Sequence, residues 1–446
     1  MLSSIIKDLD ERILKDPNLV QSVFDDLVAA QRELGLVFKD RPTCPFLRPH
    51  IVARSQYEKV SQAASTIAAA VDRVVAHALT DDALLSALAA TPREIRMARI
   101  DPGYSSLCVS SRLDAYVSES GFQFLEYNAE TPAGVGDQMQ LEKILFALAF
   151  LRELLAGRAY WRPEPHRRLL TALTETYRDW EGSQEHPNIA IVDWKGVATE
   201  SEFHVLRQYF AAEGYETVIA DPDELSYDGD RLWLRDFRID IVYKRVIIHE
   251  FLDRCSDDHP LARAYADKRV CVVNSFRTKL AHKKAIFAIL SNPQYAHLFT
   301  PTELEVFRKC IPWTRRVAQG RTTFHGSETE LLDLIRRERH RLVLKPNDDY
   351  GGHGVFIGWE TAVDEWDGAI GVALKRPYVV QERVTLEKVP IPMFSDHVQI
   401  AEMFIDFNPF LFHNETEGAL IRLSNSSLLN VTSGGGQTAL LVLEDV

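Results

Sequence analysis

The chain has 446 residues, of which 46% are hydrophobic and 26% are charged. This is the composition of an ordinary globular protein with room for two or three domains. The formal net charge of −13 argues against a nucleic-acid surface, and we expect no nucleic-acid partner, although 51 Lys and Arg residues can still form a local basic pocket.

Cysteines and targeting segments narrow the class of protein further. The five cysteines are scattered without a C-x-x-C pair, which favours neither a zinc site nor a disulfide framework. Several charges among the first twenty residues leave no visible secretory signal, and the longest apolar stretch, from Leu141, is too short and too charged to span a bilayer. We therefore expect a cytoplasmic protein without a membrane partner, and we disregard the glycosylation sequons at Asn414, Asn425 and Asn430.

Residues 1–95 are predicted to form a helical N-terminal region. They are rich in alanine and follow a helical period, most clearly over residues 57–79. Residues 96–160 are predicted to continue with a β-hairpin and then an amphipathic helix from about residue 136 to residue 155.

Residues 112–134, RLDAYVSESGFQFLEYNAETPAG, carry the predicted hairpin. Two apolar-rich runs flank a turn, and a three-residue loop ending at Gly121 is favoured because glycine adopts the left-handed backbone conformation at little cost. The resulting register makes three cross-strand pairs: Ser118 with Phe122, Asp114 with Glu126, and Arg112 with Asn128.

The pair of carboxylates in this register needs an explanation. Asp114 and Glu126 would repel each other and destabilise the hairpin. A cation between them would reverse the sign of that interaction, and oxygen ligands suit magnesium or manganese. The alternative is a solvent-facing pair of strands whose charges are hydrated.

Residues 186–272 are predicted to form an α/β domain. Apolar runs at 188–194, 216–220 and 239–245 alternate with a helix over 200–213, which is the spacing of a sheet with three or more strands. The segment after the first strand, DWKGVATE, lacks G-x-G-x-x-G, so dinucleotide binding is not expected.

Residues 273–446 mix one helix with many strands. The helix is predicted over residues 275–290, and strands are predicted at 341–346, 378–384, 402–407, 418–424 and 428–432.

A lysine and a glycine-rich loop follow the strand at 341–346 in RLVLKPNDDYGGHGVFIG. Glycines at this density let backbone N–H groups approach a polyphosphate, while Lys345 supplies a point charge. The Walker pattern G-x-x-x-x-G-K-[ST] is absent, because the lysine precedes Gly351, Gly352 and Gly354. The alternative is a tight hairpin loop with a surface lysine behind it.

Three later features are also open to two interpretations. Gln381 and Glu382 end an apolar strand and suit an adenine ring, or they mark a core strand reaching the surface. Arg422 lies on an otherwise apolar strand, either as a clamp on a phosphate or carboxylate or as a surface residue. The segment TSGGGQ at 432–437 is either an anion-binding nest or a turn.

Together these segments resemble the ATP-grasp ligases, and within them the circularly permuted branch with the synthetase domain of glutathionylspermidine synthases. The resemblance covers about residues 95–446. It runs through R-x-D at Arg112, E-Y-N at Glu126, T-P-A-G at 131–134, K-A-I at Lys284, and the glycine-loop segment from Lys345.

The resemblance implies a role for each matching residue. Arg112 would contact phosphate, and Arg422 would hold the transferred phosphate. The implied metal ligands are Asp114, Glu126 and Asn128, for Mg²⁺ or alternatively Mn²⁺. The implied ATP-binding residues are Lys284, Lys345, Tyr350, Gly351, Gly352, Gly354, Gln381 and Glu382. Lys279 and Lys283 compete with Lys284 for the role of first nucleotide lysine.

The resemblance also implies an α/β fold with α+β lobes. Residues 96–160 and 273–446 would form the ATP-grasp core, and 186–272 a domain like the one that precedes this core in the family. Circular permutation would explain why the metal ligands precede the glycine loop, so that the cleft is built from both ends of the chain. An amidase domain is absent from the pattern, and no residue matches recognition of glutathione or spermidine.

The implied activity is that of an ATP- and magnesium-dependent carboxylate–amine ligase. ATP would convert a carboxylate of a small molecule or peptide to an acyl phosphate, and an amine would displace the phosphate. One alternative is an ATP-binding protein of the same fold that acts as a nucleotide-dependent partner without ligation. Another is an α/β protein whose glycine loop is incidental. The substrates and the oligomeric state are left open.

Overall fold

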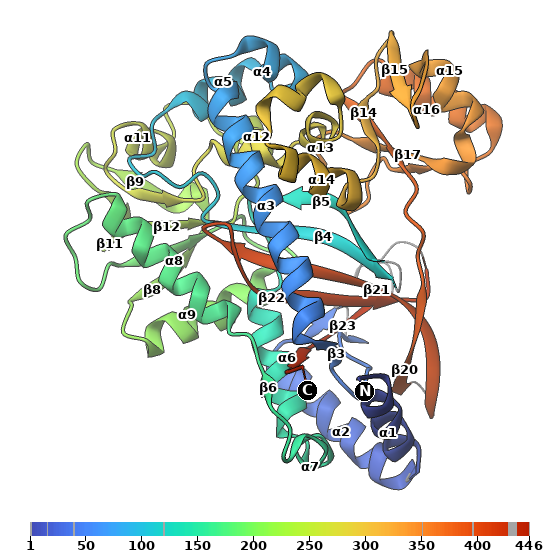
Figure 1. Ribbon diagram of the computed structural model, residues 1–446. Helices are drawn as coiled ribbons and strands as arrows, with labels where there is room; N and C mark the ends of the chain where they lie inside the picture. The colour runs from blue at the N-terminus through green and yellow to red at the C-terminus, as the bar shows by residue number, and fades with distance from the viewer. Residues whose placement is uncertain are drawn as a thin grey trace.

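The computed structural model describes residues 2–15, 17–38, 41–118, 121–349, 351–394, 397–426 and 435–445. Within them the chain forms a mixed α/β fold in which helices pack on several separate sheets, as predicted (Figure 1). None of the helices in this part of the chain has the length and apolar character needed to cross a membrane.

The N-terminal region is mainly helical, and its longest helix, α3, passes through the middle of the molecule (Figure 1). Most of the alanine side chains and all of the valine side chains of α3 are buried, and the helix spans nearly all of the one predicted over 57–79. The helices are α1 (Leu2–Lys15), α2 (Pro17–Glu33), α3 (Arg54–Ala78), α4 (Asp82–Leu88) and α5 (Pro92–Arg99).

Short strands tie this helical region to the end of the described chain. Strand β3 (His50–Ala53) pairs in parallel with β24 (Leu440–Leu443), and β24 also pairs with β6 (Tyr160–Trp161). Strands β1 (Val37–Phe38) and β2 (Arg41–Pro42) form a separate antiparallel pair. The region is therefore less purely helical than its alanine content suggests.

The predicted α/β domain contains a four-stranded parallel sheet. Its order is β13 (Cys271–Val273), β12 (Ile241–Lys244), β7 (Ile189–Val192) and β8 (Thr217–Ala220). Successive residues of β7 enter two different hydrophobic cores, so the strand is buried on both faces and reads as a continuous apolar run. Around the sheet lie α8 (Pro165–Asp179), α9 (Glu200–Ala212), α10 (Ile248–Arg254) and α11 (Pro260–Ala266), and an antiparallel sheet of β9 (Leu225–Tyr227), β10 (Leu232–Leu234) and β11 (Phe237–Ile239).

A second four-stranded sheet carries the predicted nucleotide lysine. Its order is β14 (Thr314–Arg316), β19 (Tyr378–Glu382), β17 (Leu342–Pro346) and β18 (Phe356–Ile357). Helices α15 (Leu331–Arg337) and α16 (Val363–Ala373) pack on it through a core that includes Trp366, and the hairpin of β15 (Arg321–Phe324) and β16 (Ser327–Glu330) lies beside it. Helix α14 (Pro301–Cys310) packs against α3.

A six-stranded sheet joins the predicted hairpin to the last part of the chain. The order is β23 (Gly436–Thr438), β22 (Glu415–Ser424), β21 (Val398–Phe412), β4 (Ser110–Ser118) and β5 (Gly121–Asn128), with β20 (Lys388–Phe394) also on β21. The expected pairs of Asp114 with Glu126 and of Arg112 with Asn128 are confirmed.

The expected pair at the turn of the hairpin is wrong. Ser118 pairs with Gly121, and Phe122 pairs with Val117. An irregularity between Asp114 and Ala115 shifts the register by one residue, as a β-bulge does.

Two helices predicted as continuous are each broken. The first is α6 (Val135–Ala147) followed by α7 (Ala149–Leu155), with the extended residue Leu148 between them. The second is α12 (Thr278–His282) followed by α13 (Ala285–Leu290), where Lys283 has φ −57° and ψ 127°. The strand predicted at 428–432 lies outside the described residues.

Candidate active site

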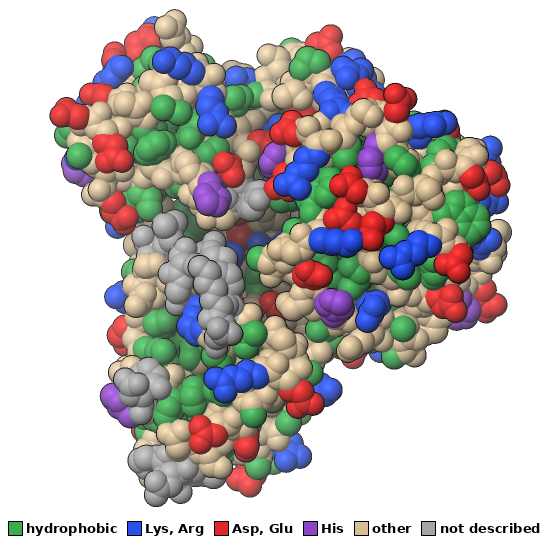
Figure 2. Space-filling model, turned by 180° about the vertical axis from the view of Figure 1, so that it is seen from behind, with side chains coloured by type: hydrophobic (Ala, Val, Ile, Leu, Met, Phe, Trp, Pro, Cys, Tyr) green, Lys and Arg blue, Asp and Glu red, His purple; other side chains and the backbone are tan. Residues whose placement is uncertain are grey.

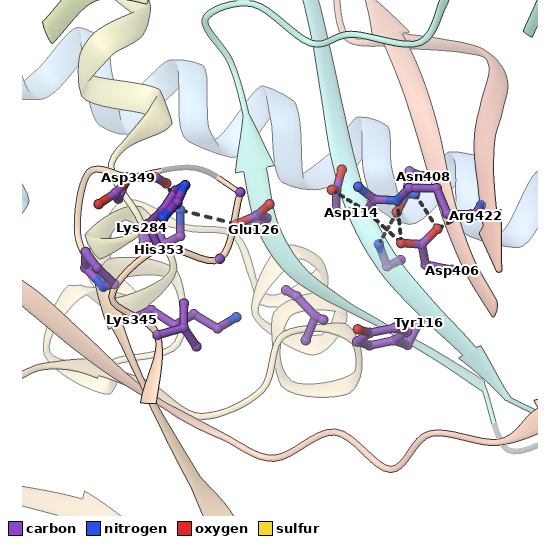
Figure 3. A pocket seen from close by; sticks show the side chains of 16 residues that line it. Asp114, Tyr116, Glu126, Lys284, Lys345, Asp349, His353, Asp406, Asn408 and Arg422 are labelled. Carbon is purple, nitrogen blue, oxygen red and sulfur yellow. Dashed lines mark hydrogen bonds and ion pairs between the residues drawn. The ribbon is translucent and has the colours of Figure 1, made fainter. Parts of the chain in front are cut away.

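A cavity of about 360 Å³ lies between the six-stranded sheet and the sheet that carries Lys345. Seen from behind, the molecule is hollowed where its lobes meet (Figure 2). Figure 3 shows the charged side chains that line the cavity, and they come from four regions of the chain: Asp114, Glu126, Lys284, Lys345, Asp349, Asp406 and Arg422.

Asp114 is held by two arginines. Its carboxylate accepts hydrogen bonds from Arg112 Nε at 2.7 Å and Nη2 at 3.0 Å, and from Arg422 Nη2 at 2.9 Å. Arg112 donates its other bond to the carbonyl of Ala133 and is not among the described residues that line the cavity. The predicted metal ligand Asp114 is therefore already hydrogen-bonded to two cations.

Asp406 and Asn408 complete this network, and the sequence analysis missed both. Arg422 Nε donates to Asp406 at 2.8 Å, and Asn408 Nδ2 donates to the other oxygen of Asp406 at 2.7 Å. Burial raises the pKa of Asp406 to about 6, even with Arg422 beside it. Two polar residues at a spacing of two on an apolar strand were the available signal.

Glu126, on the neighbouring strand, points away from this network and toward Lys284 (Figure 3). Its carboxylate is 3.2 Å from Lys284 Nζ, and Asn128 Nδ2 donates to it at 3.4 Å. Burial alone would raise the pKa of Glu126, but the Lys284 and Lys345 ammonium groups hold it well below its usual range. The carboxylate is therefore ionised inside a cluster of cations.

The broken helix separates the three competing lysines. Lys284 lines the cavity and also donates to the backbone carbonyl of Asp349 at 2.9 Å. Lys283 turns into the protein, where it lies 2.8 Å from Glu94 and 2.7 Å from Asp348. Lys279 is buried as well, 2.5 Å from Asp348 and 3.0 Å from Glu130.

Lys345 stands between the charged cavity and an apolar one. Its ammonium donates to Gln381 Oε1 at 2.7 Å, and burial lowers its pKa to about 8. The neighbouring cavity, of about 280 Å³, is lined by Lys345, Gln381 and Glu382 together with apolar side chains that include Val343, Ile357, Trp359, Leu386 and Phe404. The carboxylate of Glu382 also accepts a hydrogen bond from Arg341 Nη2 at 2.7 Å.

The glycine loop closes the cavity on the side of Lys345. Gly351, Gly352 and Gly354 have φ of +67°, +80° and +68°, in the left-handed region where glycine is favoured. Gly351 and Gly352 line the cavity, whereas Gly354 lies against Pro346 and Tyr378. The predicted contact Tyr350 lies outside the described residues, as do residues 432–434 of TSGGGQ.

The arrangement suits a polyanion with a divalent cation. Lys284, Lys345 and Arg422 point their charges into one cavity, and an apolar pocket adjoins it. The carboxylates of Glu126 and Asp349 line the cavity and are chemically suitable for magnesium. Asn128, the third predicted ligand on the hairpin, is not among the described lining residues and reaches the site through its hydrogen bond to Glu126. Asp349 was missed in the sequence because it was treated only as part of the loop.

No protein-family model matches the chain. Two curated relatives are uncharacterized proteins of Mycobacterium leprae (strain TN), 25% identical over 353 residues, and of Mycobacterium tuberculosis (strain ATCC 25618 / H37Rv), 24% identical over 341 residues. The matches cover 74% and 72% of this chain but 58% of each relative, so the chain spans less than two thirds of their length.

One solved structure matches along nearly the whole chain. It is a glutathione synthetase-like effector from Globodera pallida in its apoform, with a TM-score of 0.58, 13% identity, and coverage of 96% of this chain and 98% of that one. The chain has a glutathione synthetase-like fold. This ATP-grasp-related fold is the one that the motifs around Glu126 and Lys345 predicted, whereas the circularly permuted order stays a prediction.

Proposed function

We propose that the protein is an ATP- and magnesium-dependent carboxylate–amine ligase. The observation that carries the proposal is the convergence of Lys284, Lys345 and Arg422 with Glu126 in one cavity. These residues come from distant parts of the chain, and a cavity that gathers three cations beside four carboxylates is suited to a polyphosphate with a divalent metal ion. The glutathione synthetase-like fold supports the same proposal.

ATP binds across the two adjoining cavities in this proposal. The apolar pocket around Trp359 and Phe404 receives the base, and the polar groups of Gln381 and Glu382 face its edge. Lys345 then lies where the base side meets the phosphate side. Backbone N–H groups of Gly351 and Gly352 approach the phosphates, as in other glycine-rich anion-binding loops.

Glu126, Asn128 and Asp349 are the proposed metal-binding residues. Magnesium held there would neutralise phosphate charge and polarise the transferred group. Asp114 takes a different role in this proposal, because its oxygens are bonded to Arg112 and Arg422. It orients Arg422 toward the cavity instead of binding the metal.

The ligase reaction needs charge neutralisation and protection from water. Lys284 and Arg422 offset the negative charge that spreads over the transferred phosphoryl group. The acid and the amine are small-molecule or peptide substrates held in line with ATP, which removes part of the entropic barrier. The glycine loop covers the cavity and shields the acyl phosphate from hydrolysis.

The test uses the purified chain and separates three outcomes. A rise in melting temperature with ATP and MgCl₂, absent with ATP and EDTA, is expected for a magnesium-dependent nucleotide site. A screen of carboxylate and amine pairs should then give ADP release that requires both substrates. ATP binding without such release in any pair would favour a nucleotide-dependent binding protein, and no response to ATP would reject the proposal.

A further inference from the structure

A second charged cavity lies away from the proposed active site. It has a volume of about 490 Å³ and lies beside the edge strand β14. One wall is formed by α13 and residues 291–295, and the other by the hairpin of β15 and β16. In Figure 1, β14 lies between α13 and the β15–β16 hairpin, and the sheet order makes it an edge strand. The cavity shares no lining residue with the two cavities around Lys345.

Arg315, the central residue of β14, is buried in the wall of this cavity without a carboxylate partner. Arg315 is only 6% exposed, and no salt bridge joins its guanidinium group to any described Asp or Glu. Nε donates to Thr322 Oγ1 at 3.1 Å, and Nη1 donates to the carbonyls of Ser291 at 3.1 Å and Thr314 at 2.7 Å. Nη2 makes no hydrogen bond within the described chain.

A buried guanidinium without a counter-charge is unfavourable. Desolvation by burial lowers the pKa of Arg315 to about 10. The Trp313 ring, 5.0 Å from the guanidinium carbon, offers a partial compensation. A bound anion would supply the missing charge, since buried charges in proteins are normally paired.

The rest of the lining has the same sign. Arg316 and Arg321 also line the cavity, whereas none of the described lining residues is Asp or Glu. Arg321 is ion-paired outside the lining with Glu328 at 3.1 Å and Glu330 at 3.9 Å, so the uncompensated charge comes from Arg315 and Arg316. Arg316 donates to the carbonyl oxygen of Ser86 and so is another arginine without an ion pair among the described residues. Neutral donors complete the lining at Asn292, Gln294, Thr322 and Thr323.

We propose that this cavity binds a small anion that carries a phosphate or carboxylate group, with Arg315 as its central contact. Phosphate and carboxylate oxygens both accept charged hydrogen bonds from arginine, and the Nη2 group of Arg315, which has no partner within the described chain, suits either group. The site is independent of ATP binding at Lys345. Thr314, not Arg315, contacts Gln381, and successive strand residues point to opposite faces of a sheet.

Isothermal titration of the full chain with inorganic phosphate and, in a second arm, with citrate tests this proposal at constant ionic strength. Arg315→Gln should weaken binding of the preferred anion about tenfold, the loss expected for a charged hydrogen bond. Arg308→Gln, which removes the same charge from an exposed position, should leave the affinity unchanged. The arm with tighter binding identifies the group as phosphate or carboxylate.

A second variant covers the case in which Arg315→Gln does not fold. Ala318→Glu adds a carboxylate to the lining and keeps Arg315, so it should abolish binding of either anion in a folded protein. Binding that survives Ala318→Glu, or that Arg308→Gln weakens as much as Arg315→Gln, overturns the proposal. Loss of phosphate binding in Lys345→Met would place the anion in the ATP cavity and would also overturn it, as would no binding of either anion.

Discussion

The carboxylate of Asp114 lies 2.9 Å from Arg422 Nη2, although 308 residues separate the two in the sequence. Glu126, directly opposite Asp114 in the hairpin, instead lies 3.2 Å from Lys284. Two carboxylates that would repel each other in isolation are thus each paired with a different cation. In the proposed function, Asp114 positions Arg422 and Glu126 binds the metal.

Asp114→Asn should therefore lower stability, whereas Glu126→Gln should remove the response to magnesium. Loss of the Asp114 charge leaves two largely buried guanidinium groups short of a partner, and we expect the free energy of unfolding to fall by about 3 to 5 kcal/mol. Glu126→Gln should change stability much less but abolish the magnesium-dependent rise in melting temperature with ATP. Urea unfolding and thermal shift measure the two quantities. Equal stability losses, or normal MgATP binding in Glu126→Gln, would contradict the assignment.

Neighbouring lysines at the helix break should also behave differently. Lys283→Met leaves Glu94 and Asp348 with one cation fewer in a buried cluster, and a loss of about 3 to 5 kcal/mol of stability is expected. Lys284→Met should retain most of the stability and lose ATP affinity, because Lys284 faces the cavity. Urea titration and equilibrium ATP binding distinguish them. The assignment fails if the variant at Lys283 is the one that folds normally and loses ATP.

Nucleotide binding should weaken as Lys345 loses its proton. Its pKa in the folded protein is about 8, so at pH 9 about one molecule in eleven keeps the charge and the affinity for MgATP should be about tenfold lower than at pH 7. Lys345→Arg is the matched control, because arginine stays charged throughout this range. Calorimetric titration across pH 7 to 9 checks the slope. A flat profile in the unmodified protein would count against the lysine.

The same titration affects stability with the opposite sign. In the unfolded chain, Lys345 keeps its proton up to the ordinary lysine pKa of 10.5. Between about pH 8 and 10.5 the unfolded state therefore binds more protons than the folded state. The contribution of Lys345 to the free energy of unfolding therefore rises with pH in this window. Subtracting the unfolding profile of Lys345→Arg from that of the parent protein isolates the effect.

Replacing glycine by alanine should cost different amounts of stability at different positions of the glycine loop. Gly352→Ala meets open space and adds only the strain of φ +80°, about 1 to 2 kcal/mol. Gly354→Ala adds contacts of 2.9 Å with Pro346 and Tyr378, so its loss should be larger. Gly368→Ala, in helix α16 with open space around it, should stabilise the protein by about 0.5 to 1 kcal/mol. Thermal unfolding ranks the three, and any other order contradicts the loop geometry.

Local patterns predicted the segments well and their irregularities poorly. Alternation of apolar residues gave the pairs at Asp114 and Arg112, but a bulge has no period of its own and displaced the turn. The apolar period of residues 275–290 continues through Lys283, because the break is imposed by charges on other segments. Asp348 and Glu94 bind Lys283 from sequence positions far from it.

Long-range partners explain the remaining differences. Nothing near Asp114 in the sequence indicates that Arg422 will reach it, and this contact is the reason for proposing a positioning role for Asp114. The arginine cavity at β14 was missed for a similar reason. Its significance depends on the lack of acids around Arg315, which appears only once α13 and the β15–β16 hairpin pack beside the strand.

The six-stranded sheet also has a consequence for the order of folding. Contacts between segments that far apart in sequence close large loops and form slowly, and they cannot form on the ribosome before β21 and β22 have been synthesised. Asp114 begins with Arg112, two residues away, as its nearest partner and gains Arg422 only after β22 has been synthesised. The cavity therefore acquires its final charge balance only after β22 has joined the sheet, and a chain interrupted before Arg422 lacks the cation that Asp114 and Asp406 share.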